Sequence, residues 1–196
     1  IHSGKTGLGT VSAWAGSDIR VYDAGMMKTS VRPDIINKKL RCTSGNIAKG
    51  PAMSREECLT LIEAGIEAGK KIASDGYDIA GVGELGICNT ATTAAALSGL
   101  CGAAAEKTVG RGASTTEQMY ALKIAAVKKA LAVNKPHADD PIDCLAKVGG
   151  FDLAAMCGCY IGLASSGLSA VIDGFISGTA ALCAVKLNPL IKDYLF

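Results

Sequence analysis

Apolar and polar residues alternate along this chain with two different periods. Short apolar runs predict strands over 18–23, 78–84 and 169–173, and the stretches between them carry the wider apolar spacing of helices. Strands that alternate with helices predict an α/β fold with three layers and a doubly wound, mainly parallel sheet. The sequence shows no internal repeat and no second domain, so residues 1–196 are expected to form a single domain.

Capping residues indicate where the helices begin. Ser54-Arg-Glu-Glu57 is a capping box that predicts a helix over about 55–74. Ser114-Thr-Thr-Glu117 is a second capping box, and it predicts a helix that ends near Val133. The pair Asp140-Pro141 is typical of the start of a further, short helix.

The stretch 153–163 is uncharged and carries Gly158 and Gly162 one helical turn apart. Small residues at this spacing let two helices approach closely, so we expect this helix in a tightly packed interior, with a dimer contact as one candidate partner. The turn Ser165-Ser166-Gly167 interrupts the apolar run, and a membrane span is therefore not expected.

The most informative segment is 81–97, where an apolar strand runs through a tight loop into a helix. The run from Tyr77 to Val82 is expected to be a parallel strand buried on both faces. Glu84 follows that strand, and a carboxylate there is unfavourable unless it is paired or used. Gly83 and Gly86 allow the backbone to approach a ligand closely.

The same segment offers polar groups that suit an anion. Asn89 or Thr90 is expected to cap the Ala-rich helix that follows, whose free N–H groups attract negative charge. An ordinary buried strand-to-helix turn is the alternative explanation of these residues, and only the placement of Glu84 argues against it. Both interpretations stay open on this segment alone.

A lysine is expected to face inward on the helix after Ser114. Lys123 falls at the edge of an apolar stripe formed by Met119, Leu122, Ala126, Ala130 and Val133. An inward Lys is more often a snorkelling side chain than a ligand, unless an anion lies at its tip. The glycine loop Gly110-Arg-Gly112 supplies flexible backbone for such an anion.

Carboxylates end the three predicted strands, at Asp23, Glu84 and Asp173. Ligands of parallel α/β sheets bind outside the carboxyl ends of the strands, so a site is expected there. The polar stretch 26–53 predicts a long irregular loop, and such loops often cover or line a site.

Composition narrows the class of partner. The chain has 20 basic and 18 acidic residues, which are interspersed and leave a net charge of +2. A broad cationic face for a nucleic acid or a membrane is therefore not expected, and a small-molecule partner is favoured. Hydrophobic residues make up 49% of the chain, enough for a full core.

Most of the eight cysteines lie inside apolar runs, where cysteine acts as a small hydrophobic residue. We expect a reducing, cytoplasmic location rather than a disulfide framework. Cys157-x-Cys159 and only two histidines make a poor zinc set, so no metal is expected.

Four motifs follow one another in a fixed order along the chain: Gly83-Glu-Leu-Gly-Ile-Cys-Asn-Thr90, Gly110-Arg-Gly112, Asp140-Pro141 with Gly149-Gly-Phe151, and Asp173-Gly-Phe-Ile-Ser177. This ordered set closely resembles the nicotinate-nucleotide:dimethylbenzimidazole phosphoribosyltransferases. The segment 46–54 is also similar, and the likeness runs from about Asp18 to the C-terminus. Each motif alone is weak, whereas the ordered set is specific.

The resemblance implies a homodimeric α/β enzyme of the lower-ligand branch of cobalamin assembly, with no cofactor and no metal. Such an enzyme transfers the ribose phosphate of nicotinate mononucleotide to 5,6-dimethylbenzimidazole or a related base, and gives alpha-ribazole phosphate and nicotinate. Displacement at an anomeric carbon needs a phosphate clamp, a polar hold on the ribose and a base for the azole N–H. Glu84 is the candidate catalytic residue, with a positioning role. The candidate substrate-binding residues are Gly86, Asn89, Thr90, Gly110, Arg111, Gly112, Lys123, Asp173, Gly174 and Phe175.

The chain also departs from the family pattern. Cys88 stands where Gly is usual, Ala113-Ser114 replaces Thr-Gly, and Asp152 stands where Glu is common. Family members continue into a segment with a Glu that acts as general base, and this chain ends before it. We therefore expect part of a longer protein, and expect residues 1–196 alone to bind nucleotide weakly and to turn over slowly. The alternative function is a non-catalytic nucleotide-binding scaffold or a truncated, inactive paralogue.

Overall fold

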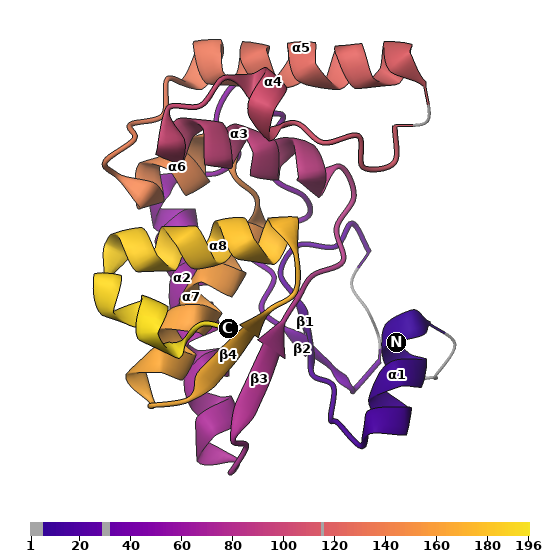
Figure 1. The fold of residues 1–196 in the computed structure, drawn as a ribbon, viewed down its shortest axis with the longest axis vertical. Coiled ribbons are helices and arrows are strands. Elements are labelled where there is room, and N and C mark those ends of the chain that lie inside the picture. The colour runs from indigo at the N-terminus through magenta and orange to yellow at the C-terminus, as the bar shows by residue number, and fades with distance from the viewer. Residues whose placement is uncertain (1–5, 29–31, 115) are drawn as a thin grey trace. The chain divides into compact units, whose positions relative to one another are not determined.

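The computed structural model describes residues 6–28, 32–114 and 116–196 (Figure 1). Its residues group into two compact units, 1–42 and 43–196, and each is described by itself. The expected α/β class with parallel strands is confirmed. The single domain expected from the sequence stays a prediction.

The first unit contains α1 (Gly7–Ala15), β1 (Val21–Asp23) and β2 (Ile35–Asn37). The two strands pair in parallel, with Val21 opposite Ile35. The strand expected at 18–23 is therefore present but shorter. The prediction that 26–53 is wholly irregular is wrong, because β2 lies within it; a strand of three residues is too short to leave a visible alternation.

Asp23 closes the turn after β1. Its Oδ1 accepts hydrogen bonds from the N–H groups of Gly25 at 2.9 Å and Met26 at 2.8 Å, and its Oδ2 lies 3.2 Å from Lys39 Nζ. Asp23 is 3% exposed. A buried carboxylate is stable when it is paired and hydrogen-bonded, so these contacts explain how Asp23 can be buried within its own unit.

The second unit holds the remaining helices and strands. They are α2 (Arg55–Ser74), β3 (Ile79–Val82), α3 (Asn89–Cys101), α4 (Ala105–Thr108), α5 (Glu117–Asn134), α6 (Pro141–Val148), α7 (Phe151–Ser165), β4 (Ser169–Ile172), α8 (Phe175–Leu187) and the 3₁₀ helix η1 (Pro189–Tyr194). No helix in the described part of the chain is long and apolar enough to cross a membrane.

The capping signals place most helix starts correctly. The Ser54 hydroxyl accepts from Glu57 N–H at 3.1 Å and the Glu57 carboxylate accepts from Ser54 N–H at 2.9 Å, so the first capping box is confirmed. Asp140 caps α6 as expected. The second box is wrong: the N-cap of α5 is Thr116, whose hydroxyl accepts from Met119 N–H at 3.2 Å. Thr115, within the predicted box, lies outside the described residues.

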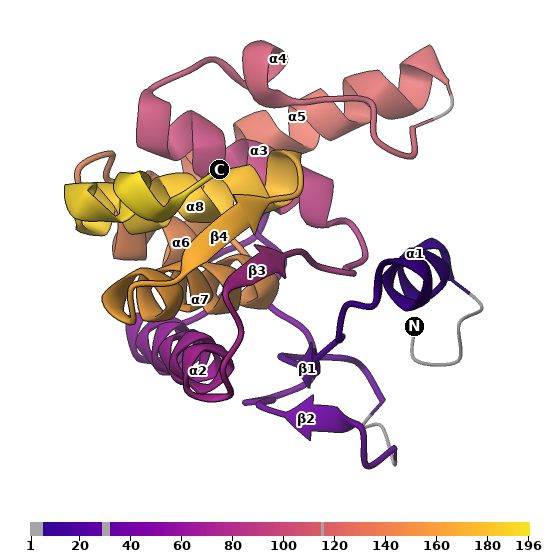
Figure 2. The same ribbon diagram turned by 60° about the horizontal axis from the view of Figure 1, so that its bottom comes forward.

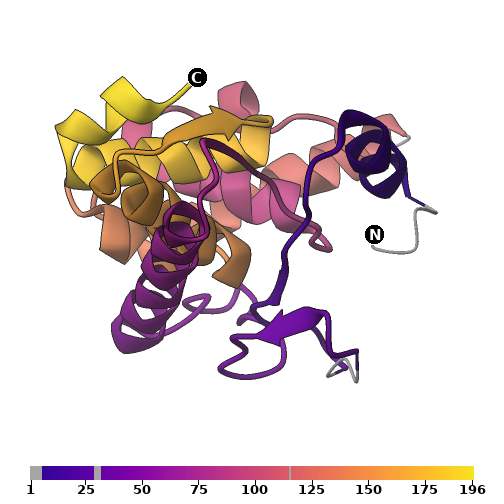
Figure 3. The ribbon, with the colours of Figure 1, turned by 90° about the horizontal axis from the view of Figure 1, so that it is seen from below.

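Helices α2 and α7 lie side by side over their lengths (Figures 2 and 3). Glycines on both helices form this contact. A Cβ at Gly158 would overlap the carbonyl oxygen of Ile62, and a Cβ at Gly65 would overlap that of Ala155. The tightly packed interior expected for 153–163 is confirmed, and the close partner of this helix in the structure is α2.

Strands β3 and β4 pair in parallel, with Ile79 opposite Ser169 and Val82 opposite Ile172. The side chains alternate between a buried and an open face, because Val82 is 7% exposed and Ile79 is 55% exposed. The expectation that this strand is buried on both faces is therefore wrong. An apolar run satisfies either pattern, and only the packing of the neighbouring elements decides between them.

The buried face of α5 also differs from the predicted stripe. Ala130 is buried as predicted, whereas Met119, Leu122 and Val133 are 47%, 64% and 47% exposed. Val127, which was not part of the predicted stripe, is buried. Apolar residues lie on more than one side of this helix, so the periodicity did not identify the buried face. Lys123 lies beside the true buried face, and its inward placement is confirmed by the contacts described below.

Candidate functional site

The candidate site begins where β3 leads into α3. Glu84 follows β3 and is partly buried, and its carboxylate accepts a hydrogen bond from the Asn89 side-chain amide. The same Asn89 nitrogen lies 3.1 Å from Asp152 Oδ2 at the start of α7. Asn89 is 9% exposed, so one buried amide joins two carboxylates from distant parts of the chain.

Gly86 is required by this close contact. A Cβ at position 86 would lie 2.6 Å from Asn89 Nδ2 and 3.0 Å from Asp152 Oδ2. Any larger residue would force the amide or the carboxylate to move. The sequence prediction of a glycine at a close approach is therefore supported, and here the backbone approaches two polar side chains.

Cys88 forms the N-cap of α3 in a left-handed conformation, with φ of 63° and no side-chain capping bond. The expectation that Asn89 or Thr90 caps the helix is wrong, since these are its first two residues. They still belong to the turn whose N–H groups lack intrahelical partners. The left-handed backbone also explains why glycine suits position 88, because other residues pay a steric penalty there.

The neighbours of Glu84 favour its protonated form. Burial raises the pKa of Glu84, and the charges of Asp152 and Asp173 raise it further. Hydrogen bonds from the Asn89 side chain and the Gly86 backbone act in the opposite direction. A carboxylate whose pKa is raised in this way is a better proton acceptor once it is ionised than one with an ordinary pKa.

Lys123 reaches from α5 to α3 and to the glycine loop. Its Nζ donates to Thr90 Oγ1 at 2.9 Å, to the carbonyl of Gly110 at 2.7 Å and to that of Arg111 at 3.4 Å. Burial lowers the pKa of Lys123. Gly112, with φ of 54°, brings its backbone so close that a Cβ would lie 3.1 Å from Lys123 Nζ.

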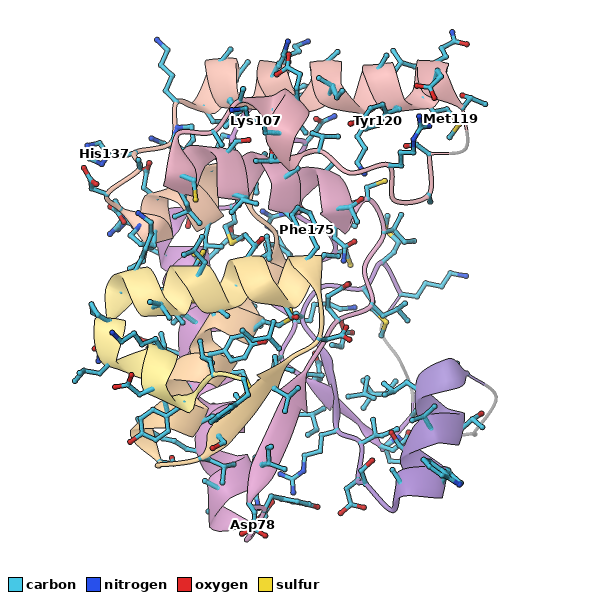
Figure 4. The ribbon with its side chains drawn as sticks, viewed as in Figure 1. Asp78, Lys107, Met119, Tyr120, His137 and Phe175 are labelled. Carbon is cyan, nitrogen blue, oxygen red and sulfur yellow. The ribbon has the colours of Figure 1, made fainter. Side chains whose placement is uncertain are left out.

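The Arg111 side chain points to a different set of groups. It pairs with Glu117 in the first turn of α5, and its guanidinium lies 5.1 Å from the centre of the Tyr120 ring. Figure 4 shows Tyr120 at this end of α5. Only the backbone of Arg111 reaches Lys123, so the side chain is not brought together with the other predicted residues.

A pocket of about 180 Å³ opens beside Glu84. It is lined by Glu84, Thr90, Asp173, Gly174, Phe175, Ile176 and Ser177. Figure 4 shows Phe175 at the start of α8, on the side of that helix that faces α3. Pockets for whole small molecules measure about 300–1,000 Å³, so this one fits a part of a substrate such as a sugar ring.

The structure thus brings most of the predicted residues together. Thr90 connects the pocket to Lys123 and the glycine loop, and Asn89 and Gly86 adjoin Glu84. Asp23 belongs to the first unit, in which it closes the turn after β1.

Sequence reasoning did not assign Asp152, Ile176 or Ser177 to the site. Ser177 is 2% exposed, and its hydroxyl accepts from the N–H of Gly174 at 2.9 Å, which fixes the turn that lines the pocket. The sequence signal for Ser177 was its position three residues after Gly174, which follows the end of a predicted strand. For Asp152 the signal was its place two residues after Gly150, in the first turn of a helix.

The arrangement supplies two kinds of group, one at the Thr90 edge of the pocket and one inside it. Lys123, the Thr90 hydroxyl and the N-terminus of α3 can hold an anion such as a phosphate. Glu84, supported by Asn89, can accept hydrogen bonds from hydroxyl or azole N–H groups. The geometry therefore suits a ligand that carries both a phosphate and a polar ring.

Comparison with known proteins gives the same family as the motifs. A family model described as phosphoribosyltransferase matches residues 1–196. The chain is 46% identical over 192 residues to the nicotinate-nucleotide–dimethylbenzimidazole phosphoribosyltransferase of Clostridium acetobutylicum, and 43% identical over 192 residues to that of Escherichia coli strain SE11. Each alignment covers 98% of this chain and 54% of the relative. The chain therefore spans about half the length of the curated relatives it matches.

Solved structures agree with these sequence matches. The crystal structure of CobT from Thermus thermophilus superposes with a TM-score of 0.93 at 34% identity, and the match covers 99% of this chain and 58% of that chain. A second structure, of the nicotinate-nucleotide-dimethylbenzimidazole phosphoribosyltransferase from the same organism, gives a TM-score of 0.91 at 33% identity. The resemblance inferred from the motifs is confirmed, and so is the α/β class of the fold.

Proposed function

Because the chain belongs to the phosphoribosyltransferase family, we propose that its protein transfers the ribose phosphate of nicotinate mononucleotide to 5,6-dimethylbenzimidazole or a related base. The products are alpha-ribazole phosphate, for the lower ligand of cobalamin, and nicotinate. One observation carries this proposal: Thr90 joins the Lys123 cluster to the pocket that contains Glu84. An anion and a polar ring can therefore be held within one substrate.

The phosphate is assigned to the corner between α3 and the glycine loop. Lys123 supplies the positive charge, Thr90 a hydroxyl, and the first turn of α3 supplies N–H groups. The glycines Gly110 and Gly112 let the loop backbone lie close to Lys123. Charge-assisted hydrogen bonds of this kind are about twice as strong as neutral ones, so this corner anchors the substrate.

The ribose or the azole is assigned to the pocket beside Glu84. Asn89 orients the Glu84 carboxylate, and Asp173, Gly174 and Phe175 also line the pocket. A positioned carboxylate can accept a hydrogen bond from a ribose hydroxyl or from the azole N–H. Glu84 therefore helps to place one of the two reactants for the displacement, and correct placement of reactants lowers the barrier of such a reaction.

The azole must lose its N–H proton as it attacks the anomeric carbon. The family resemblance implies a glutamate base outside residues 1–196, and we retain that assignment. Glu84 is the group within this chain that is best suited to take over part of that role, since its pKa is raised by burial and by two neighbouring carboxylates.

We also assign the protein to the cytoplasm, as a homodimer. All eight cysteines are free thiols, which suits a reducing compartment. Helix α5 carries Met119, Leu122 and Val133 exposed in this chain, and an exposed apolar helix face is typical of a contact surface. Sedimentation velocity checks the dimer: a coefficient that matches one copy at micromolar concentration would contradict it.

Acceptor-dependent release of nicotinate tests the proposed function. Nicotinate is measured by chromatography after incubation of the gene's full product with nicotinate mononucleotide, with and without 5,6-dimethylbenzimidazole. The proposal predicts release that depends on the benzimidazole. A non-catalytic scaffold would bind the nucleotide and release no nicotinate under either condition.

A further inference from the structure

Asp152 lies next to the proposed site and has no role in the function described above. It comes from the first turn of α7, far along the chain from Glu84. Its Oδ2 lies 3.1 Å from Asn89 Nδ2, and the same nitrogen donates to the Glu84 carboxylate. An amide nitrogen carries two hydrogens, so Asn89 can donate one to each carboxylate.

Both ends of this bridge are fixed in place. The Leu153 N–H donates to Asp152 Oδ1 at 2.9 Å, and the position in the first turn of α7 favours a negative charge. Gly86 lies against both partners, because a Cβ there would be 3.0 Å from Asp152 Oδ2 and 2.6 Å from Asn89 Nδ2. The bridge is therefore a close-packed arrangement.

Asp152 also acts on Glu84 through its charge. The carboxylates that face Glu84 are Asp152 from α7 and Asp173 from the end of β4, and both raise the pKa of Glu84. Asn89, from α3, is uncharged and lowers it through its hydrogen bond. Asp152 thus affects both the orientation and the ionisation of Glu84.

We propose that Asp152 is a positioning residue of this site: it holds the Asn89 amide against the Glu84 carboxylate and places a second negative charge beside it. The inference rests on the proposed function, in which Glu84 accepts a hydrogen bond from ribose or azole. A carboxylate that is both oriented and destabilised as an anion is a better hydrogen-bond and proton acceptor than an isolated one.

The pH profile of kcat/KM for nicotinate release tests this role in the gene's full product. Glu84 must be ionised to accept, so activity falls as the pH drops through its pKa. Asp152→Asn keeps an oxygen that can accept from Asn89 but removes the charge. The pKa of Glu84 then falls, and the acid limb moves to lower pH, by about half a pH unit or more.

Three further variants separate this role from a structural one. Asp152→Glu keeps the charge and is expected to leave the acid limb in place. Asp152→Ala removes the partner of Asn89 and is expected to raise KM by about three-fold to ten-fold, the loss of roughly one hydrogen bond. Asp139→Asn removes an exposed carboxylate elsewhere and is the matched control. An acid limb that does not move in Asp152→Asn, in protein with an unchanged melting temperature, overturns the proposal.

A second readout does not depend on the proposed function. Carbon-13 NMR of glutamate-labelled protein follows the Glu84 side-chain carboxyl, assigned by its loss in Glu84→Gln, as the pH is varied without substrate. Its midpoint is expected at lower pH in Asp152→Asn than in the unmodified protein. An unchanged midpoint refutes the link between the two residues, whereas failure to release nicotinate refutes only the proposed function.

Discussion

At the residue scale, the proposed anion-binding corner depends on the contacts of Lys123. Its hydrogen-bond acceptors among the described residues are the Thr90 hydroxyl and the carbonyls of Gly110 and Arg111. These acceptors are neutral, so they orient the ammonium group without offsetting its charge. A lysine held in this way is ready to attract a phosphate at its tip.

Lys123→Ala is expected to weaken the binding of nicotinate mononucleotide and of inorganic phosphate about ten-fold to a hundred-fold. This is the effect of losing a charged hydrogen bond. Binding of 5,6-dimethylbenzimidazole should change little, because that ligand carries no phosphate. Isothermal titration calorimetry measures the three affinities. Lys129→Ala, on an exposed position of the same helix, is the matched control. Equal losses for the phosphate ligands and the benzimidazole would refute the assignment.

Single residues also show where sequence reasoning stops. Glu84 and Lys123 could be placed from local patterns, a carboxylate at a strand end and a lysine beside an apolar face. Asp152 could not, because its contact with Asn89 joins two helices that are distant in sequence. Cys88 was visible only as a departure from the family, and its meaning needed the left-handed φ of 63°.

At the element scale, the contact between α2 and α7 supports the second unit. Gly65 and Gly69 of α2 lie against α7, and Gly158 and Gly162 of α7 lie against α2. A side chain at any of these four positions would clash with the backbone of the other helix. A Cβ at Gly69, for example, would lie 2.6 Å from the Cys159 carbonyl oxygen. Because α7 carries Asp152 in its first turn, this packing also fixes one end of the site.

Gly158→Leu is expected to lower the free energy of unfolding by about 1–3 kcal/mol or more, because the side chain would force the helices apart. Urea unfolding followed by circular dichroism measures the change. The matched control is Gly50→Leu, since a Cβ at Gly50 has no heavy atom within 4 Å. If both variants unfold at the same urea concentration, the helix contact is looser than described here.

Element boundaries were predictable where a polar cap and an apolar period agreed. Helix α2 begins and ends where the sequence placed it, because Ser54 and Glu57 form a capping box and one face is clearly apolar. Helix α5 was predicted, but its capping residue and most of its buried face were not, since Leu122 and Val133 are exposed while Val127 is buried. Strand β2 was missed because it is too short to show a period.

At the scale of the whole molecule, the sequence and the structure lead to the same family by different routes. The ordered motifs already resembled these phosphoribosyltransferases. Residues of the motifs at 83–90 and 173–177 line one pocket, and Lys123 joins Thr90 to the glycine loop at 110–112. Order along the chain identified the family, whereas the contacts between motifs became visible only in the fold.

The central claim is that ribose and phosphate move together from nicotinate to a benzimidazole. The most direct measurement uses nicotinate mononucleotide labelled with carbon-13 in its ribose, incubated with the gene's full product and 5,6-dimethylbenzimidazole, and analysed by mass spectrometry. The claim predicts one new product that contains the benzimidazole, the labelled ribose and the phosphate, in equal amount to the nicotinate released. Labelled ribose phosphate found free, with nicotinate released equally fast without the benzimidazole, would contradict it.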